Sequence, residues 1–413
     1  MLYLHAVLYI NFYVQSNILA KKLLEPYVIC GVVGIVAFTA VGTTALSSVR
    51  KRSYKVFYVV HVSLATILLP VLFFHVSHIR IYLYQTAIVY ALNALLRAFS
   101  SRAYHGAIKL VPGTQLVKID ISLPKSASRG RGPTIWQPGQ HAYVSLPGHP
   151  LSRTFRSNPF TVASLPAVDG KVQFVAKVLD GNTAKLAQAA EGVSKASHDL
   201  TLEGPYGVAS HPERLLRYDR VLLIAGGVGA TFTVPLYRQL LADLSPSKGS
   251  YRRQRVSFVW IAHSKADVMW AIPEDAKERE GFIERLEVFF TGGDQQSGLH
   301  ANDNFTIGDD DDERTDKVAF GDSEEGIELE EQKNLLAGEP HDESKKDAAG
   351  FVTYAGRPDL ERLLDQAFSH GHAEKVAIVV CGPKSLTTEL RSCVGRWVNK
   401  GRDVWFWQES FAL

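Results

Sequence analysis

Acidic residues are almost absent from the first 97 positions of this 413-residue chain, where Glu25 is the only one. Two stretches in that part, residues 26–49 and 56–79, contain no Lys, Arg, Asp or Glu. Each is long enough as a helix to cross a hydrocarbon core of ~30 Å. Charge returns after Arg97 at a density typical of soluble proteins, so the pattern excludes a chain that is soluble throughout.

Two further absences bear on the start of the chain and on its compartment. Residues 1–20 are uncharged but lack the basic n-region and the cleavage site of a signal peptide. We therefore expect a cut-off transmembrane helix and a chain that begins inside a larger membrane domain. Cysteine is also scarce: Cys30, Cys381 and Cys393 are too few for a disulfide framework, which favours a reducing compartment for the soluble part.

A third apolar run, residues 81–96, lies between Arg80 and Arg97, whose long side chains can reach the membrane interface. Basic residues gather in the loop at positions 50–55, and the positive-inside rule places that loop in the cytosol. The chain then crosses outward through residues 56–79 and returns through the third run. We expect a multi-pass protein in contact with lipid, at the plasma membrane, with its soluble domains in the cytosol.

The soluble region changes its hydrophobic pattern near residue 210. Short β runs separated by turn residues fill positions 105–210, which is typical of a β-barrel. From 217 to 413 apolar strands alternate with helical stretches, which is typical of an α/β domain. The expected fold class is therefore multi-domain, with an α-helical transmembrane bundle at residues 1–100, then a β-barrel, then an α/β nucleotide-binding domain.

An acidic segment interrupts the α/β region at about residues 292–350. It contains 18 Asp or Glu against 5 Lys or Arg and few aromatic residues, a composition typical of disorder. A calcium loop is the alternative, but the central Gly and final Glu of the EF-hand spacing are missing. The rest of the chain keeps 40 of 45 basic and 24 of 42 acidic residues. The remainder is therefore basic, which favours binding of anionic lipid and phosphorylated cofactors. The sequence contains no recognisable nucleic-acid-binding module.

Four histidines lie in the apolar segments, and His78, at the membrane edge three residues past His75, is expected to be structural or interfacial. His61 and His75 are fourteen positions apart on one helix, which places them within ~40° of the same face and ~21 Å apart along the axis. This spacing fits two stacked haems, because haem iron can take two histidines from facing helices. His5 lies in a separate apolar helix. The alternative is a hydrogen bond to a neighbouring helix, since an unsatisfied imidazole is costly in the hydrocarbon region.

Glycine motifs punctuate the α/β region and the strand before it. Gly226-Gly227-Val228-Gly229 follows an apolar strand and opens a helix, so its backbone N–H groups can receive a phosphate. It is not the Rossmann spacing, and such a turn can be purely structural. Gly204-Pro205-Tyr206-Gly207 precedes it, and Cys381-Gly382-Pro383 follows a late apolar strand. Cys381 can equally be a small buried residue before a tight turn.

A proline-containing pair of motifs lies in the barrel region. Pro138-Gly139-Gln140-His141 comes first, and Arg156-Ser157-Asn158-Pro159-Phe160-Thr161-Val162 follows it. With these motifs, the paired histidines and the three glycine motifs in order, the chain resembles the fungal ferric reductases of the ferric-chelate reductase and NADPH oxidase superfamily. The resemblance covers nearly the whole chain apart from the acidic segment. It implies a ferredoxin reductase-like soluble region with FAD, NADPH and haem b as cofactors.

The resemblance also implies roles for individual residues. Thr161 would face the isoalloxazine, Cys381 would lie near the nicotinamide and Phe411 would lie against the flavin ring. The family usually has His where this chain has Asn158. The cofactor-binding candidates are Arg156, Asn158, Pro159, Phe160, Thr161, Val162, Lys177, Gly181, Thr183, Gly204, Pro205, Tyr206, Gly207, Gly226, Gly227, Gly229, Thr231, Cys381, Gly382 and Pro383. Weaker candidates for the 2′-phosphate of NADPH are Ser264, Lys265 and Arg357.

The metal-ligand candidates are His5, His61 and His75. The family pattern pairs His5 with His75 at the outer haem and gives His61 to the inner haem. The partner of His61 would lie about fourteen residues before His5, so the sequence is a fragment or the inner site is lost.

The activity implied by the resemblance is electron transfer from cytosolic NADPH, through FAD and haem, to an extracytoplasmic ferric or cupric chelate or a siderophore. An NADPH oxidase that reduces oxygen and a degenerate relative without a complete haem path are the alternatives.

Overall fold

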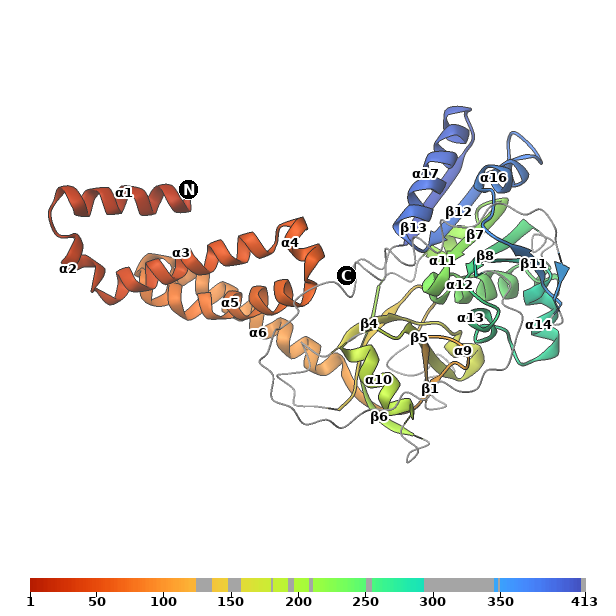
Figure 1. Ribbon diagram of the computed structural model, residues 1–413, viewed down its shortest axis with the longest axis horizontal. Helices are drawn as coiled ribbons and strands as arrows, with labels where there is room; N and C mark the ends of the chain where they lie inside the picture. Colours follow the sequence, from red (N-terminus) through yellow and green to blue (C-terminus); the bar gives the residue numbers. More distant parts are fainter. Residues whose placement is uncertain are drawn as a thin grey trace, which may run out of the picture. The chain divides into compact units, whose positions relative to one another are not determined.

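The computed structural model describes residues 1–123, 136–147, 157–179, 181–191, 197–207, 211–249, 255–292, 345–347 and 350–409. Arg156, Phe411 and most of the acidic segment lie outside these residues. The described chain falls into two compact units, Met1–Ser100 and a second that begins at Ser101. Figure 1 shows the helices of the first and the strands and helices of the second.

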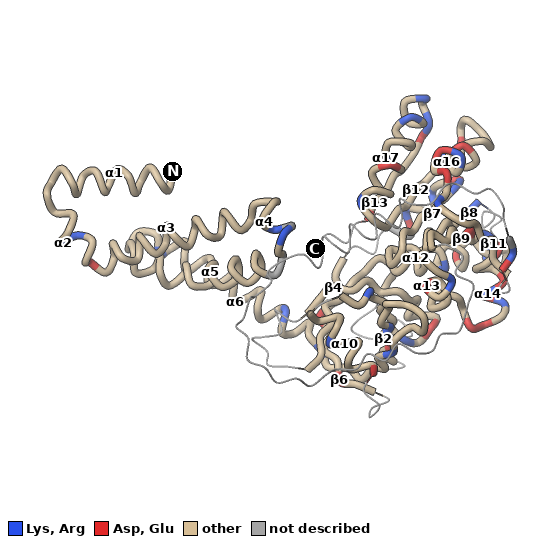
Figure 2. Tube along the Cα trace, in the orientation of Figure 1, with Lys and Arg blue, Asp and Glu red and all other residues tan. Residues whose placement is uncertain are grey.

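The first unit is helical. It consists of α1 (Leu2–Gln15), α2 (Leu19–Leu23), α3 (Pro26–Thr44), α4 (Ser47–Arg52), α5 (Tyr54–His75), the short 3-10 helix η1 (Ser77–Ile79) and α6 (Arg80–Ser100). Three segments are long and apolar enough to cross a membrane, Pro26–Thr44, Val56–His75 and Ser77–Ser100. The three predicted spans are confirmed on this basis. Figure 2 shows how few charged positions lie along α1, α3 and α5, and the basic positions at α4.

Local sequence sets the ends of these helices. Pro26 at the first position suits the start of α3, because its missing N–H has no partner there in any helix. The hydroxyl of Ser53 accepts a hydrogen bond from the Val56 amide and caps α5. α3 packs along α5, with Gly31 against the His75 ring and Gly34 against Leu72, because small residues let membrane helices approach closely.

The barrel begins the second unit. Its strands are β1 (Ser101–Leu110), β2 (Leu116–Ser122), β3 (His141–Ser145), β4 (Asn158–Thr161), β5 (Lys171–Lys177) and β6 (His198–Tyr206), in the antiparallel order β4-β3-β6-β1-β2-β5. A bridge between Val162 and Phe174 joins the two edges and closes the sheet. Alternate residues of the strands, such as Ile119 and Ile121, fill the interior. The predicted barrel is therefore confirmed.

Two helices accompany the barrel. α10 (Asn182–Glu191) packs against β1 and β2, and the short α9 (Pro166–Asp169) lies in the connection from β4 to β5.

The α/β domain follows. β7 (Arg220–Gly226), β8 (Val256–Ala262), β9 (Leu286–Phe290), β11 (Val352–Ala355), β12 (Val376–Cys381) and β13 (Val404–Glu409) are parallel, in the order β11-β9-β8-β7-β12-β13. β10 (Lys345–Lys346) pairs antiparallel with β11 at the edge. The helical segments are α11 (His211–Leu215), η2 (Gly227–Gly229), α12 (Ala230–Asp243), η3 (Pro246–Lys248), α13 (Ala266–Met269), α14 (Ala276–Ile283), α16 (Leu360–Phe368) and α17 (Lys384–Asn399).

Helices cover both faces of this sheet. One buried cluster joins the sheet to α12 and α14, and a second joins it to α16 and α17. β12 is buried along its whole length, and β7 from Val221 onward, as expected of central strands in a parallel sheet. The first cluster also includes Leu116, Ala163 and Val175 of the barrel. The barrel therefore keeps its own core and also contributes these three residues to a cluster of the α/β domain within the second unit.

Candidate flavin, nucleotide and haem sites

Two of the predicted glycine motifs meet where the order of strands reverses. β7 and β12 are neighbours, with Ala225 paired to Cys381, and the strands after them run outward in opposite directions across the sheet. η2 and α12 follow β7, while Gly382 and Pro383 follow β12. The crevice beyond the carboxyl ends of such strands is where open α/β sheets bind ligands.

The glycines at this point allow the two strand ends to touch. A Cβ on Gly229 would collide with the carbonyl of Cys381, and one on Gly226 would lie 2.7 Å from Cδ of Pro383. A Cβ on Gly382 would lie 2.9 Å from the Gly226 nitrogen. These residues therefore have a packing role. The first amide of α12, that of Ala230, donates to the carbonyls of Gly227 and Val228 in η2, and phosphate binding at this helix start stays a prediction.

Cys381 is fully buried at the end of β12. Burial, and secondarily the charge of Glu409 opposite it on β13, raises the pKa of this thiol well above its usual value. The thiol therefore stays protonated at physiological pH and acts as a neutral group. This environment agrees with the small-buried-residue interpretation, and its contact with a nicotinamide stays a prediction.

A corner of the barrel gathers the predicted flavin residues. His141 on β3 pairs with Thr161 on β4 and with Tyr206 on β6, so the three residues form a row across neighbouring strands. The rings of His141 and Tyr206 are 6.0 Å apart, and the Tyr206 hydroxyl donates a 2.9 Å hydrogen bond to Glu203. Asn158, Pro159 and Phe160 precede Thr161 on the same strand.

His141 was not among the site residues predicted from the sequence, although it ends the motif Pro138-Gly139-Gln140-His141. Burial lowers the pKa of its imidazole, which favours the neutral form at physiological pH. A Cβ on Gly207, where φ is +94°, would lie 3.4 Å from its Nδ1. Gly204-Pro205-Tyr206-Gly207 therefore closes against the turn that leads into β3. The Pro-Gly-Gln-His pattern was the signal that could have identified this residue.

The start of α10 is the predicted site for the FAD pyrophosphate. The Thr183 hydroxyl accepts from the Leu179 amide at 2.8 Å and donates to the Leu179 carbonyl at 2.9 Å. It therefore closes the turn before the helix. Gly181, with φ of +76°, has open space around its α carbon, so the backbone of this first turn, with Lys177 at the end of β5, offers the better phosphate contacts.

Two of the three candidates for the 2′-phosphate, Ser264 and Lys265, are held by acidic residues. The amide and hydroxyl of Ser264 both donate to one oxygen of Asp267, at 2.9 and 2.8 Å. The ammonium of Lys265 lies 2.9 Å from Asp347. A phosphate at this position would have to displace these carboxylates.

The imidazole of His75 is oriented as a metal ligand would be. Its Nδ1 lies 2.7 Å from the carbonyl of Tyr27, and a carbonyl can only accept, so Nδ1 carries the proton. Nε2 then bears the lone pair. Tyr27 lies in α3, so this contact is the hydrogen bond to a neighbouring helix that was the alternative to haem ligation. Metal-bound histidines also donate their other N–H to a carbonyl or carboxylate in this way, so the contact is compatible with both, and ligation of haem iron by His75 stays a prediction.

His61 and His5 offer weaker indications. Nδ1 of His61 is buried and has no hydrogen-bond partner among the described residues, a state that a bound group would resolve. The ring of His5 lies 4.7 Å from that of Tyr9. Within the described helical unit no recorded ring contact or hydrogen bond joins His5 to His75, so their pairing stays a prediction.

Comparison with known proteins gives three matches along the chain. Residues 1–74 match the family described as ferric reductase like transmembrane component, 105–210 match the FAD-binding domain, and 218–395 match the ferric reductase NAD binding domain.

Curated relatives match over most of this chain. "Probable metalloreductase AIM14" of Meyerozyma guilliermondii is 24% identical, covering 87% of this chain and 64% of the relative. The protein of the same name in Yarrowia lipolytica is 26% identical, with 99% and 76% covered. "Ferric/cupric reductase transmembrane component 2" of Schizosaccharomyces pombe is 22% identical, with 97% and 70% covered. The chain thus spans 64 to 76% of these relatives' length.

Among solved structures, a ferredoxin NADP+ reductase from Neisseria gonorrhoeae has 12% identity and a TM-score of 0.44, with 75% of this chain and 98% of that one covered. The matched segments together include the helical unit, the barrel and most of the α/β domain. The chain thus contains, in this order, a ferric reductase like transmembrane component, an FAD-binding domain and a ferric reductase NAD binding domain.

Proposed function

We propose that this chain oxidises cytosolic NADPH and passes the electrons across a membrane to a ferric or cupric chelate or a siderophore. The observation that carries the proposal lies in the second unit. Ala163, two residues after Thr161, belongs to the same buried cluster as Ala225, Ala230 and Cys381 at the strand reversal. The strand of the expected flavin corner and the strand ends of the expected nicotinamide site therefore contribute to one continuous buried cluster.

Each side of that core would bind one cofactor. Thr161, His141 and Tyr206 would line the flavin ring, and the first turn of α10 would receive the pyrophosphate. The start of α12 would receive the phosphates of NADPH, with Gly229 and Gly382 keeping side chains out of the way. FAD, when bound, supplies the conversion from a two-electron hydride donor to one-electron acceptors.

The helical unit would carry the electrons onward. His75, with Nδ1 held by the Tyr27 carbonyl, would offer Nε2 to haem iron. His61 and His5 are the other proposed ligands. Haem supplies one-electron redox chemistry in the membrane. The basic residues of α4 support a cytosolic position for the soluble domains by the positive-inside rule, and the plasma membrane is the proposed location.

A test uses the full chain in detergent, supplied with NADPH under anaerobic conditions. Flavin bleaching near 450 nm, followed by reduction of an added ferric chelate, is expected. Flavin reduction with no transfer to the chelate, but with superoxide formed on admission of air, would favour the oxidase instead. A preparation that binds FAD but leaves it oxidised by NADPH would contradict the proposal.

A further inference from the structure

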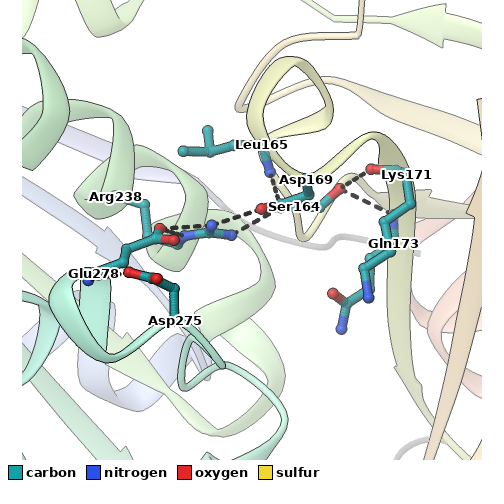
Figure 3. Close-up of polar contacts among 8 residues, drawn as sticks. All are labelled: Ser164, Leu165, Asp169, Lys171, Gln173, Arg238, Asp275 and Glu278. Atoms are coloured by element: carbon teal, nitrogen blue, oxygen red, sulfur yellow. Dashed lines mark hydrogen bonds and ion pairs between the residues drawn. The ribbon is translucent and has the colours of Figure 1, made fainter. Parts of the chain in front are cut away.

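An ion-pair cluster crosses from the barrel to the α/β domain away from the cofactor candidates (Figure 3). Nη1 and Nη2 of Arg238 donate to the two oxygens of Asp169 at 2.9 and 2.7 Å. Nε of the same guanidinium donates a hydrogen bond to Glu278 at 2.8 Å. The Arg238 and Asp169 side chains are only 10% and 15% exposed. Such bidentate geometry fixes direction as well as distance.

The electrostatic balance at Arg238 favours its charged form. Burial alone would lower its pKa, but the hydrogen bonds and charges of Asp169 and Glu278 outweigh that and raise it. The guanidinium therefore carries its charge at any physiological pH. Removing Arg238 would leave two carboxylates without their cation in a largely buried place, which is costly. Removing Asp169 would leave Arg238 paired with Glu278 alone and would lose the bidentate contact to the barrel.

Each end of this cluster lies on an element that also carries residues of one expected cofactor site. Asp169 also accepts from the Leu165 amide at 2.9 Å, which fixes the turn that leaves β4. Ser164 in that turn donates to the Lys171 carbonyl and accepts from the Gln173 amide. Thr161 lies at the end of β4, three residues before Ser164. The turn is therefore a rigid extension of the flavin strand.

The other end lies on the nucleotide helix. Arg238 is seven residues after Thr231 in α12, so both project from nearly the same face, two turns apart. Glu278 is positioned by α14, where Asp275 caps the helix by accepting from the Glu278 amide at 2.9 Å. Among the described residues a cavity of about 300 Å³ opens beside the cluster, lined by Leu165 and Val168 on one side and Gln239 on the other.

We propose that the Arg238–Asp169 pair is a positioning latch that sets the orientation of the flavin strand relative to the nucleotide helix for hydride transfer. It touches neither cofactor candidate. Its effect would come through alignment, where a shift of about 1 Å at the reacting atoms can cost up to ~100-fold in rate. The inference rests on the proposed function, because it is hydride transfer that the latch would serve.

The test compares three variants of the full chain. Asp169→Asn keeps an oxygen for the Leu165 amide but loses the bidentate ion pair, and Arg238→Lys keeps the charge but loses the fork. Glu374→Gln is the matched control. It removes the 2.6 Å ion pair between Arg220 and Glu374, which lies inside the α/β domain and has side chains that are 18% and 20% exposed. FAD content, thermal midpoint, the rate of flavin reduction by NADPH and its KM are measured.

The expected result is a slower flavin reduction in Asp169→Asn, by about 10- to 100-fold, with unchanged FAD content and KM for NADPH. Arg238→Lys should lie between this variant and the parent. Reduction by dithionite should be unaffected in all. If Asp169→Asn lowers the thermal midpoint as Glu374→Gln does and leaves the rate unchanged, the pair is only structural and the inference is wrong.

A second readout does not depend on activity. Hydrogen exchange of the amides in residues 164–170 and in α12 should quicken in Asp169→Asn and stay at the parent rate in Glu374→Gln. Equal exchange in both would overturn the latch even in a preparation that does not oxidise NADPH. Failure of the parent chain to reduce its flavin would instead contradict the proposed function.

Discussion

The helical unit and the soluble unit use polar groups in opposite ways. In the helical unit most large apolar side chains are exposed, and a polar group such as His75 Nδ1 is directed inward to a backbone carbonyl. In the soluble unit apolar residues form the core, and a charged group such as Arg238 is buried only with two carboxylates beside it. Each arrangement follows from the surroundings, because an unpaired polar group is costly both in lipid and in a protein interior.

This contrast predicts where single changes do most harm. In the helical unit the function should depend on a few inward polar side chains, while the apolar surface tolerates change. In the soluble unit it should depend on close backbone approach and on paired charges. Four variants test the contrast, from the largest effect to the smallest.

The largest effect is expected for Gly229→Val in the soluble unit. Its side chain would collide with the Cys381 carbonyl, and two strand ends would have to separate. We expect loss of NADPH-dependent flavin reduction and a fall of about 1–3 kcal/mol in the free energy of unfolding, measured by denaturant titration. Gly395→Ala in α17, where nothing lies within 4 Å, is the control and should be neutral or slightly stabilising.

The corresponding change in the helical unit is His75→Ala. We expect one haem fewer per chain by pyridine haemochrome assay, because the axial nitrogen is lost. His78→Ala, three residues further on in η1, should keep the parent haem content. Equal haem content in the two variants would exclude His75 as a ligand.

A smaller effect is expected from the buried thiol. The folded-state pKa of Cys381 is raised, so the contribution of this group to stability is complete below the ordinary thiol pKa of about 8.5 and is lost as pH rises above it. Between pH 8.5 and 10.5 the parent should lose up to about 1.4 kcal/mol per pH unit from this group. Cys381→Ala should have a flatter pH dependence of its unfolding midpoint, whereas Cys393→Ala should retain the parent slope.

The smallest effect concerns nucleotide choice. Lys265 is about half exposed and paired with Asp347, and such a pair contributes about 0.2–1 kcal/mol. Asp347→Asn should therefore lower the KM for NADPH about 1.5- to 5-fold and leave the KM for NADH unchanged. An equal change for both nucleotides would place Lys265 away from the 2′-phosphate.

Sequence patterns predicted the parts of the molecule that depend on local order. Uncharged runs predicted the spans, alternation predicted the barrel strands, and the glycine motifs after β7 and β12 lie side by side in the structure because both end central strands. The turn chemistry was less predictable. Thr183 was predicted to bind the cofactor, but its hydroxyl is hydrogen-bonded to the backbone of Leu179 four residues earlier.

Contacts between distant residues could not be predicted from one sequence. Arg238 and Asp169 are 69 positions apart, and neither belongs to a motif. The carbonyl of Tyr27 that orients His75 is backbone, 48 positions away, so no residue type identifies it. Such contacts depend on the packing of elements, which the periodicity of each element does not specify.

The most direct test of the account is the reduced-minus-oxidised haem spectrum, with iron stoichiometry, of the purified 413-residue chain under anaerobic conditions with NADPH as the sole reductant. The account predicts haem bands that NADPH develops after the flavin bleaches. Flavin that bleaches while dithionite-reducible haem stays oxidised, or a folded chain that binds no haem, would contradict transfer of electrons from the soluble unit to the helical one.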